Sequence, residues 1–272
     1  MKISKLKNAS RALALSLSFP FLVLSLALPA LPAEGRDVYV RLANDPAKVA
    51  LTSDEPMTLI DAANKSHTLG KSAVLTRSGS SLVSGKDKFP LPARVSGGLL
   101  GYNGRKYRGL LLLTKNFVLL NVLNVEDYIQ GVLPVEASAA WPKEYLKVQA
   151  ILSRTYALRQ SLNRSARGYD VTDDTSTQVY RGAGVEAAAS NQVVRESAGQ
   201  VLTYGNDLAF TFFHSDSGGH TADNAHVWGR AVPYLKGVKE PVRYDSPNAD
   251  WSVRLSSSQV EAALSKLGRG VG

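Results

Sequence analysis

The sequence of 272 residues contains no cysteine. This absence excludes a disulfide framework, thiol catalysis and metal sites built on thiolates. The chain also lacks blocks of like charge and basic stripes interleaved with aromatic residues, so nucleic acid is not an expected partner. Three of the four histidines, His214, His220 and His226, match no compact zinc spacing. We therefore predict no metal site and no cofactor.

The first 33 residues have the pattern of a secretory signal. Four basic residues precede an apolar run over 12–28, and small residues suit cleavage after Ala30 or Ala33. An uncleaved anchor is the alternative, although the run is near the lower limit for a membrane span and Pro20 interrupts it. Both readings place the rest of the chain outside the cytoplasmic membrane, in the periplasm or cell envelope.

The net charge is modestly positive. The full chain has 32 Lys and Arg residues against 23 Asp and Glu residues, a formal charge of +9. The signal segment contributes four cations and no acids, so the remainder has 28 basic against 23 acidic residues. Such a balance suits an anionic surface such as cell wall or lipid headgroups, and it also serves simple solubility.

Residue patterns predict an α+β fold. Short apolar or alternating runs separated by turn signals indicate a small β-rich region over 37–120. Asn103-Gly104 predicts a hairpin turn. A long central helix is predicted over about 142–162, with Pro142 at its first turn and mixed or antiparallel β regions packed around it. The expected domains are the signal at 1–33, the β-rich region at 37–120 and a catalytic domain at 121–272.

Several shorter elements complete the prediction. The stretch 169–182 is dense in hydroxyls and acids, so we expect a loop that orders its own backbone and carries binding groups. The other expected elements are a buried strand at 117–125, a second helix at 185–198, a hairpin around Gly205-Asn206 and a capped final helix at 256–267.

Glu136 is the strongest candidate for catalysis. Apolar residues 132–135 precede it and alanines follow. Lys147 and Arg154 lie seven residues apart on the predicted helix, so both point from one face, roughly 10 Å apart along the axis. A lone acid in an apolar pocket that faces a cationic helix suits a proton donor beside an anion-binding surface. The alternative is that Glu136 caps a helix or forms an ion pair, and that the two cations are solvated.

Two other catalytic patterns fit less well. Asp216-Ser217-Gly218-Gly219 has the letters found around the nucleophile of trypsin-like proteases, but His220 follows in place of proline and no matching base is present. A paired-carboxylate glycosidase needs a second acid. Asp173 and Asp174 are candidates that the sequence does not place, so a single-acid mechanism has to be considered. The adjacent glycines permit positive φ and close backbone approach to a ligand.

Five segments in order carry a family resemblance. They are 126–136 (EDYIQGVLPVE), 139–157 (AAWPKEYLKVQAILSRTYA), 169–182, 203–221 with its HSDSGGHT, and 227–235. The chain from about Leu123 to Trp251 resembles the stage II sporulation protein D / amidase-enhancer family. The first segment resembles the family's opening strand with its acid, and the second resembles its central helix.

The resemblance implies a bacterial cell-wall protein. Active members are lytic transglycosylases that cleave peptidoglycan glycan strands, typically those stripped of stem peptides, and leave anhydro-muramic acid ends. The family acid falls on Glu136, which would act as general acid and then as base. The substrate-binding candidates in the matching segments are Lys147, Arg154, Gln178, Tyr180, His214, Ser217, Gly218 and Gly219.

Alternatives and departures accompany this resemblance. The protein is alternatively a wall-bound enhancer of an N-acetylmuramoyl-L-alanine amidase, with Glu136 structural, or a purely structural envelope protein. The family acid is often followed by Met-Pro, whereas Ala137-Ser138 follows here. Some relatives bind zinc through cysteine and histidine, a site that a chain without cysteine does not inherit. The family domain usually continues further, which leaves truncation of 121–272 at its C-terminus as one reading.

Overall fold

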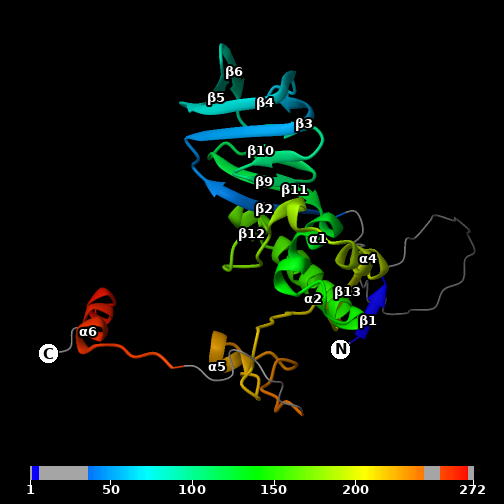
Figure 1. Cartoon of the computed structure of the whole chain (residues 1–272), viewed down its shortest axis with the longest axis vertical. Coiled ribbons are helices and arrows are strands. Elements are labelled where there is room, and N and C mark those ends of the chain that lie inside the picture. Colours follow the sequence, from blue (N-terminus) through cyan, green and yellow to red (C-terminus); the bar gives the residue numbers. More distant parts are fainter. Residues whose placement is uncertain (1, 6–35, 242–251, 269–272) are drawn as a thin grey trace, which may run out of the picture. The chain divides into compact units, whose positions relative to one another are not determined.

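The computed structural model describes residues 2–5, 36–241 and 252–268 (Figure 1). The chain forms two compact units, Met1–Phe212 and Phe213–Gly272. Of the predicted signal segment, only residues 2–5 are among the described residues, so the secretory signal stays a prediction. Within the described ranges, no helix has the length and apolar character that a membrane crossing requires.

An eleven-stranded sheet forms the framework of the first unit. Its strands follow the order β12-β2-β11-β10-β7-β3-β4-β5-β6, and β8, which pairs with β3 and β9, lies off this path. All of these pairings are antiparallel except that of β12 with β2. The strands are β2 (Asp37–Asn44), β3 (Lys48–Ile60), β4 (Ser66–Ser78), β5 (Ser81–Ser84), β6 (Asp87–Pro90), β7 (Ala93–Ser96), β8 (Leu100–Tyr102), β9 (Arg105–Tyr107), β10 (Leu110–Leu113), β11 (Val118–Asn124) and β12 (Val171–Thr172).

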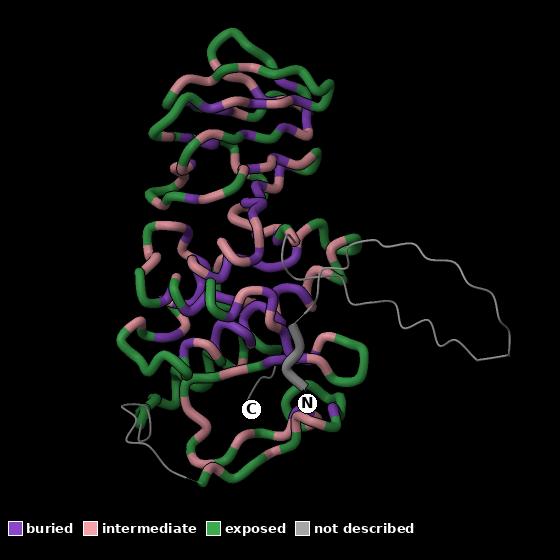
Figure 2. The backbone as a smooth tube through the Cα atoms, turned by 90° about the vertical axis from the view of Figure 1, so that its right-hand side faces the viewer, coloured by how far each residue is buried: buried purple, intermediate pink, exposed green. Residues whose placement is uncertain are grey.

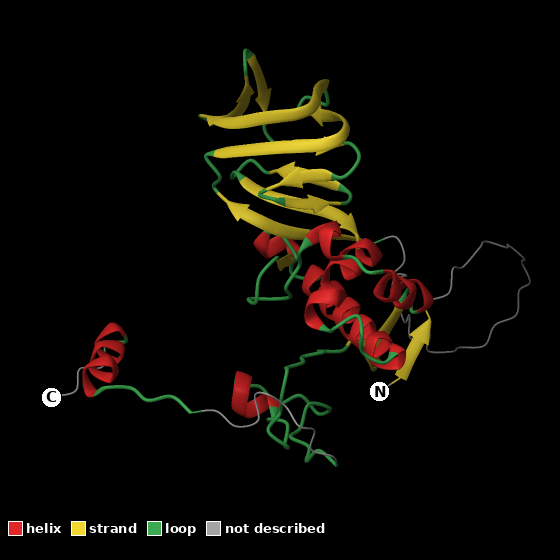
Figure 3. Ribbon diagram, viewed as in Figure 1, coloured by secondary structure: helices red, strands yellow, loops and turns green. Residues whose placement is uncertain are grey.

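Apart from β12, which comes after α3, the strands of the large sheet precede the helices along the chain, which gives the predicted α+β class. They are α1 (Val125–Glu136), α2 (Lys143–Ser161), α3 (Arg164–Arg167), the 3-10 turn η1 (Gly182–Val185) and α4 (Ala188–Glu196). A small second sheet contains β1 (Lys2–Lys5), β13 (Gln200–Tyr204) and β14 (Asp207–Leu208). The second unit contains α5 (Asn224–Trp228) and α6 (Ser257–Lys266). Figure 3 shows the helices of the first unit gathered at the β2–β11 end of the large sheet.

The strongest local signals are confirmed. The long predicted helix is α2, and the buried strand is β11. Asn103 and Gly104 connect β8 to β9 with φ of 49° and 75°, as a tight hairpin turn requires. Helix α6 has the capping box that its Ser256 and Gln259 encode. The second helix is shorter than expected, because η1 occupies part of the predicted range and no side chain caps α4.

Two hydrophobic cores meet at β11. Figure 2 shows buried backbone both in the strands of the large sheet and in the helical region. Leu119 belongs to the core of the large sheet, whereas Leu123 belongs to the core beneath the helices. Leu42 of β2 packs against both. The predicted domain boundary between residues 120 and 121 falls inside β11. That boundary stays a prediction, and the strand ties the β-rich region to the helices.

Helix α1 replaces the strand that the family resemblance implied for 126–136, so that expectation was wrong. The Asn124 side chain caps the helix by accepting the Glu126 N–H at 2.8 Å. Tyr128, Ile129 and Val132 are buried at helical spacing. Pro134 lies only in the last turn, where it leaves the earlier turns intact and helps to end the helix.

Gly131 allows α1 to approach the polar loop closely. A Cβ at this position would lie 2.5 Å from Cε2 of Tyr180 and 3.0 Å from the Gly182 carbonyl oxygen. The Gly131 carbonyl also accepts the Arg181 N–H at 3.2 Å, which holds the loop in place. The contact between α1 and this loop therefore depends on the absence of a side chain.

We expect Gly131→Ala to lower the free energy of unfolding by roughly 1–2 kcal/mol, because overpacking outweighs the gain in helix propensity. Gly184→Ala is the matched control, since a Cβ there meets nothing within 4 Å. Its effect should stay within about 0.5 kcal/mol. Urea unfolding curves measure both variants. An alanine at 131 that leaves the midpoint unchanged would contradict the tight approach.

Candidate functional site

Glu136 is the last residue of α1 and is partly exposed. Its Oε1 accepts the backbone N–H of Val179 at 2.7 Å, which joins the helix end to the polar loop. Among the described residues, Oε2 makes no hydrogen bond. The contact fixes the orientation of the carboxylate while one oxygen stays available to a ligand.

The polar loop is ordered by its own side chains, as predicted. Thr177 Oγ1 accepts the Thr172 N–H at 2.8 Å, and Asp174 Oδ1 accepts the Ser176 N–H at 2.9 Å. Asp173, one of the two candidate second acids, pairs with Arg105 at 2.8 Å. Both acids are therefore engaged in holding the loop, which presents Val179 to Glu136 as a fixed donor.

Gln178 lies beside Val179 and is 1% exposed. Its Oε1 accepts the Tyr128 hydroxyl at 3.2 Å, whereas Nε2 has no partner within the described part of the chain. Burial is the main cause that raises the pKa of Tyr128 well above its ordinary value, so this phenol keeps its proton and donates. An unpaired buried amide costs roughly 1–3 kcal/mol, and a side chain this enclosed does not contact a ligand at the surface, so the prediction that Gln178 binds substrate was wrong.

Tyr180, a predicted substrate-binding residue, instead belongs to the core. It is 1% exposed, packs against the ring of Tyr128 at 5.1 Å between centroids, and donates to Asn121 Oδ1 at 2.8 Å. A side chain enclosed in this way does not contact a ligand at the surface. Its role is to support the loop that carries Gln178.

Arg154 and Lys147 share one face of α2, as the spacing predicted, but that face packs against α4 and is not open to solvent. Lys147 remains 29% exposed at the edge, where its Nζ lies 2.8 Å from Glu144 and 3.5 Å from Glu196 of α4. Arg154 is fully buried and pairs with Glu126, with Nη2 to Oε2 at 2.6 Å. The expectation that both cations form a surface for a substrate anion is therefore wrong for Arg154.

The remaining predicted residues belong to the second unit, where they form a turn. Gly218 donates its N–H to Asp216 Oδ1 at 2.7 Å, and Gly219 donates to Ser217 Oγ at 3.0 Å. Both glycines have positive φ, 68° and 97°, as the pair of glycines predicted. His214 precedes this turn and is exposed.

The described residues contain no group of three His, Asp or Glu side chains arranged to hold a metal ion. His220 instead lies with Nδ1 2.8 Å from the carbonyl oxygen of Thr221.

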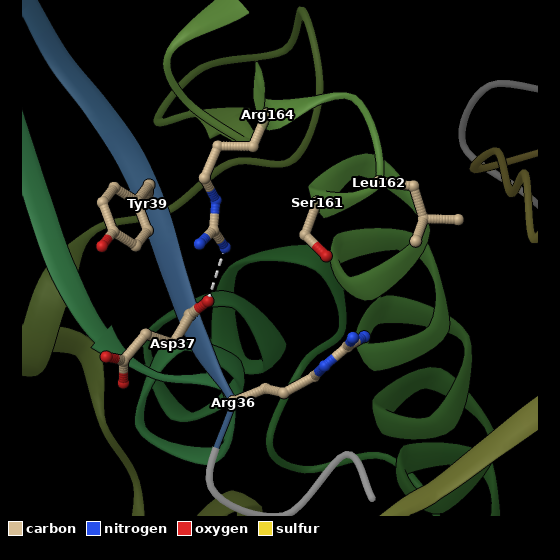
Figure 4. Close-up of a pocket in the computed structure, with 6 residues that line it drawn as sticks. All are labelled: Arg36, Asp37, Tyr39, Ser161, Leu162 and Arg164. Carbon is tan, nitrogen blue, oxygen red and sulfur yellow. Dashed lines mark hydrogen bonds between the residues drawn. The ribbon is translucent and has the colours of Figure 1, made fainter. Parts of the chain in front are cut away.

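A pocket of about 400 Å³ lies elsewhere in the first unit (Figure 4). Arg36, Asp37, Tyr39, Ser161, Leu162 and Arg164 line it. Arg164 donates to the Asp37 carbonyl at 2.7 Å and covers the Tyr39 ring at 4.0 Å. None of the predicted site residues lines this pocket, and one of its two arginines, Arg164, is engaged by protein partners.

Sequence reasoning missed one feature, which begins five positions after Glu136. Trp141 and Tyr145 form an edge-to-face pair, 4.8 Å between centroids, and each is 47% exposed. The signal was present in the sequence, because two aromatic residues stand four positions apart where a helix begins.

The fold and the site define an α+β protein with one oriented carboxylate at the junction of a helix and a polar loop. A family model described as stage II sporulation protein matches residues 114–204, which include α1, α2 and that loop. The chain therefore contains a domain of the stage II sporulation protein D and amidase-enhancer family, a family linked to cell-wall processes.

Relatives match about half of the chain. An uncharacterized protein of Brachyspira hyodysenteriae is 39% identical over 140 residues, which cover 50% of this chain and 38% of that protein. The amidase enhancer of Bacillus subtilis is 35% identical over 133 residues, 49% of this chain and 17% of the relative. Stage II sporulation protein D of Bacillus subtilis is 33% identical over 155 residues, which cover 52% of this chain and 45% of that protein. The match thus spans less than half the length of each relative.

Replacing Arg154 with alanine should lower the free energy of unfolding by roughly 3–5 kcal/mol, because Glu126 would keep a partly buried charge without its partner. Lys147→Ala should cost less than about 1 kcal/mol, since its ion pairs are solvated. Urea denaturation of the two variants measures the contrast. Equal losses would contradict the different burial of the two cations.

Proposed function

We propose that this domain is a peptidoglycan lytic transglycosylase that cleaves glycan strands, preferably those stripped of stem peptides. Glu136 acts first as general acid and then as base. The observation that carries the proposal is the carboxylate of Glu136, with Oε1 held by the Val179 N–H and Oε2 without a protein partner in the described chain.

The reaction needs only one carboxyl group. Protonated Glu136 gives its proton to the glycosidic oxygen as the bond from that oxygen to the anomeric carbon breaks. The carboxylate then takes the proton from the primary hydroxyl of the same muramic acid. The oxygen of that hydroxyl bonds to the anomeric carbon and closes the anhydro ring. No water is consumed, and Glu136 ends protonated, ready for the next cleavage.

The polar contacts of Asp173 and Asp174 support a mechanism that uses a single acid. Asp173 pairs with Arg105, and Asp174 accepts hydrogen bonds from Thr172 and Ser176. These contacts and their neighbours stabilise the ionised form of Asp174 and lower its pKa, led by the Ser176 N–H. Neither of these two aspartates is therefore arranged as a proton donor, which supports assigning that role to Glu136.

One predicted binding residue of the first unit remains accessible to the substrate. Lys147 is accessible at the edge of α2 and would attract the lactyl carboxylate that the loss of stem peptides exposes. Gln178 is not placed in contact with the substrate, because its side chain and its unpaired amide nitrogen are buried. The turn of Ser217, Gly218 and Gly219 and the exposed His214 belong to the second unit, and their binding to the strand stays a prediction from the family resemblance. Arg154 and Tyr180 are excluded because they are buried.

The proposed setting is the cell envelope. The signal-like first 33 residues motivate export to the periplasm or the outer side of the cytoplasmic membrane. Measuring which cell fraction retains the protein, and sequencing its mature N-terminus, would test this. A cytoplasmic protein that keeps Met1 would overturn it.

A second candidate is a non-catalytic role as enhancer of a cell-wall amidase. It is favoured by the 35% identity to a relative named amidase enhancer. The Glu136–Val179 hydrogen bond suits this role too, because it also fixes the loop when no proton is transferred.

Glu136→Gln should reduce the formation of anhydro ends at least about a hundredfold, because the amide keeps the shape of the side chain but neither donates nor accepts the required proton. Incubation with peptide-free glycan strands, followed by mass spectrometry, measures the products. Glu55→Gln is the control, an exposed acid of β3 outside the proposed site, and it should cleave like the wild type. Hydrated reducing ends, or full activity of Glu136→Gln, would exclude the mechanism.

The enhancer role gives a different outcome in a mixed assay. If it is correct, the wild type and Glu136→Gln both produce no anhydro ends, yet both accelerate removal of stem peptides from sacculi by an added N-acetylmuramoyl-L-alanine amidase. Amidase alone and amidase with heat-denatured protein are the controls. No acceleration by folded protein would exclude this role.

A further inference from the structure

The linker after Glu136 leads directly to an exposed aromatic pair. Trp141 precedes Pro142, the N-cap of α2, and Tyr145 lies in the first turn of that helix. Their rings pack edge to face and support each other, yet 47% of each residue remains accessible. An aromatic ring held in place by a neighbour offers binding area with little loss of conformational freedom.

The same side of α2 is open along the following turn. Val148, three residues after Tyr145, is 56% exposed. The side of the helix that carries Lys147 and Arg154 is the one that contacts α4. The aromatic pair therefore lies away from the structural ion pairs, on a surface that no described residue covers completely.

The pair also lies close to the candidate acid. Trp141 stands five positions after Glu136, a span of at most about 17 Å between Cα atoms. The linker is shorter than this limit, because it turns back on itself. The Trp141 N–H donates to the Ser138 carbonyl at 2.9 Å, and the Ala140 N–H donates to Ser138 Oγ at 3.3 Å. A ligand longer than one ring can reach both places.

We propose that Trp141 and Tyr145 form a platform on which a sugar ring of the glycan strand stacks. This inference rests on the proposed function for the class of ligand. A pyranose ring presents C–H bonds on its faces, which pack against the electron-rich face of an aromatic ring, while its hydroxyls remain hydrated. The platform would hold the strand at a fixed distance from Glu136, as positioning for the cleavage.

The size of the patch favours a sugar over a protein partner. Side chains of this kind bury about 150–250 Å² when fully enclosed, so two that are 47% exposed offer roughly 200 Å² together. A stable protein interface buries about 800 Å² on each partner. The aromatic pair is therefore too small to hold a folded protein alone, but it is sufficient for one or two sugar rings.

Binding without turnover tests the platform. In a Glu136→Gln background, peptide-free glycan strands should bind about tenfold more weakly when Trp141 is also changed to alanine, a loss that matches the apolar contact removed. Tyr145→Ala should weaken binding in the same direction. Trp141→Phe, which retains a ring, should recover most of the affinity. Val148→Ala is the matched control on the same helix side, and it should bind within about twofold of its parent.

Intrinsic fluorescence supplies a readout that a purely structural role would not change. The chain has three tryptophans, and the spectral shift on adding strands should be lost in Trp141→Phe and retained in Trp228→Phe. Circular dichroism confirms that each variant is folded.

The outcomes separate this proposal from the proposed function. Strand binding that depends on Trp141 in a protein that makes no anhydro ends would uphold the platform and exclude the transglycosylase. If the protein cleaves strands but the Trp141 and Tyr145 variants bind them as tightly as their parent, the platform is overturned and the transglycosylase proposal stands. Failure of the Glu136→Gln protein to bind strands would overturn it as well. Loss of amidase stimulation in Trp141→Ala with strand binding intact would also overturn it, in favour of a protein-docking surface.

Discussion

The buried guanidinium of Arg154 connects elements that lie far apart in the sequence. Its Nε and Nη2 bind the carboxylate of Glu126 in the first turn of α1, and its Nη1 donates to the Gln200 carbonyl at 3.1 Å, where β13 begins. Glu126 also accepts the Gly199 N–H at 3.0 Å. A charge inside a protein is tolerated only when its donors are matched, so α1, α2 and β13 are constrained to one mutual arrangement.

This arrangement determines where Glu136 can lie. Glu126 anchors the first turn of α1, and Glu136 stands ten residues later, about 15 Å along the helix axis. The Val179 N–H then holds the far end. The loop that carries Val179 is itself fixed by Tyr180 in the core and by the hydrogen bond from Tyr128 to Gln178. The carboxylate is thus positioned from both ends of its helix, and such positioning is the main requirement of a general acid.

The hydrogen bond from the Val179 N–H to Glu136 has both a structural and a chemical consequence. In the enhancer reading, Glu136 serves to join α1 to the loop, and a surface that binds glycan is sufficient. In the transglycosylase reading, the joined carboxylate also moves a proton. The aromatic pair that follows Glu136 is compatible with both readings, because stacking on a sugar retains a strand whether or not it is cut. The two functions differ only in what Oε2 does, which is why product chemistry distinguishes them.

Local signals in the sequence determined the α+β class and several elements, because their physical causes lie within a few residues. Pro142 marks the start of α2, and Asn103-Gly104 adopts the positive φ that its hairpin needs. The positions of Arg154 and Tyr180 depended on the tertiary structure. The spacing of the two cations showed correctly which side of α2 they share, but α4 comes from a distant segment and covers that side. A pattern along the chain reports the direction of a side chain, whereas the segment packed against it decides whether that side chain meets solvent, a ligand or a buried partner.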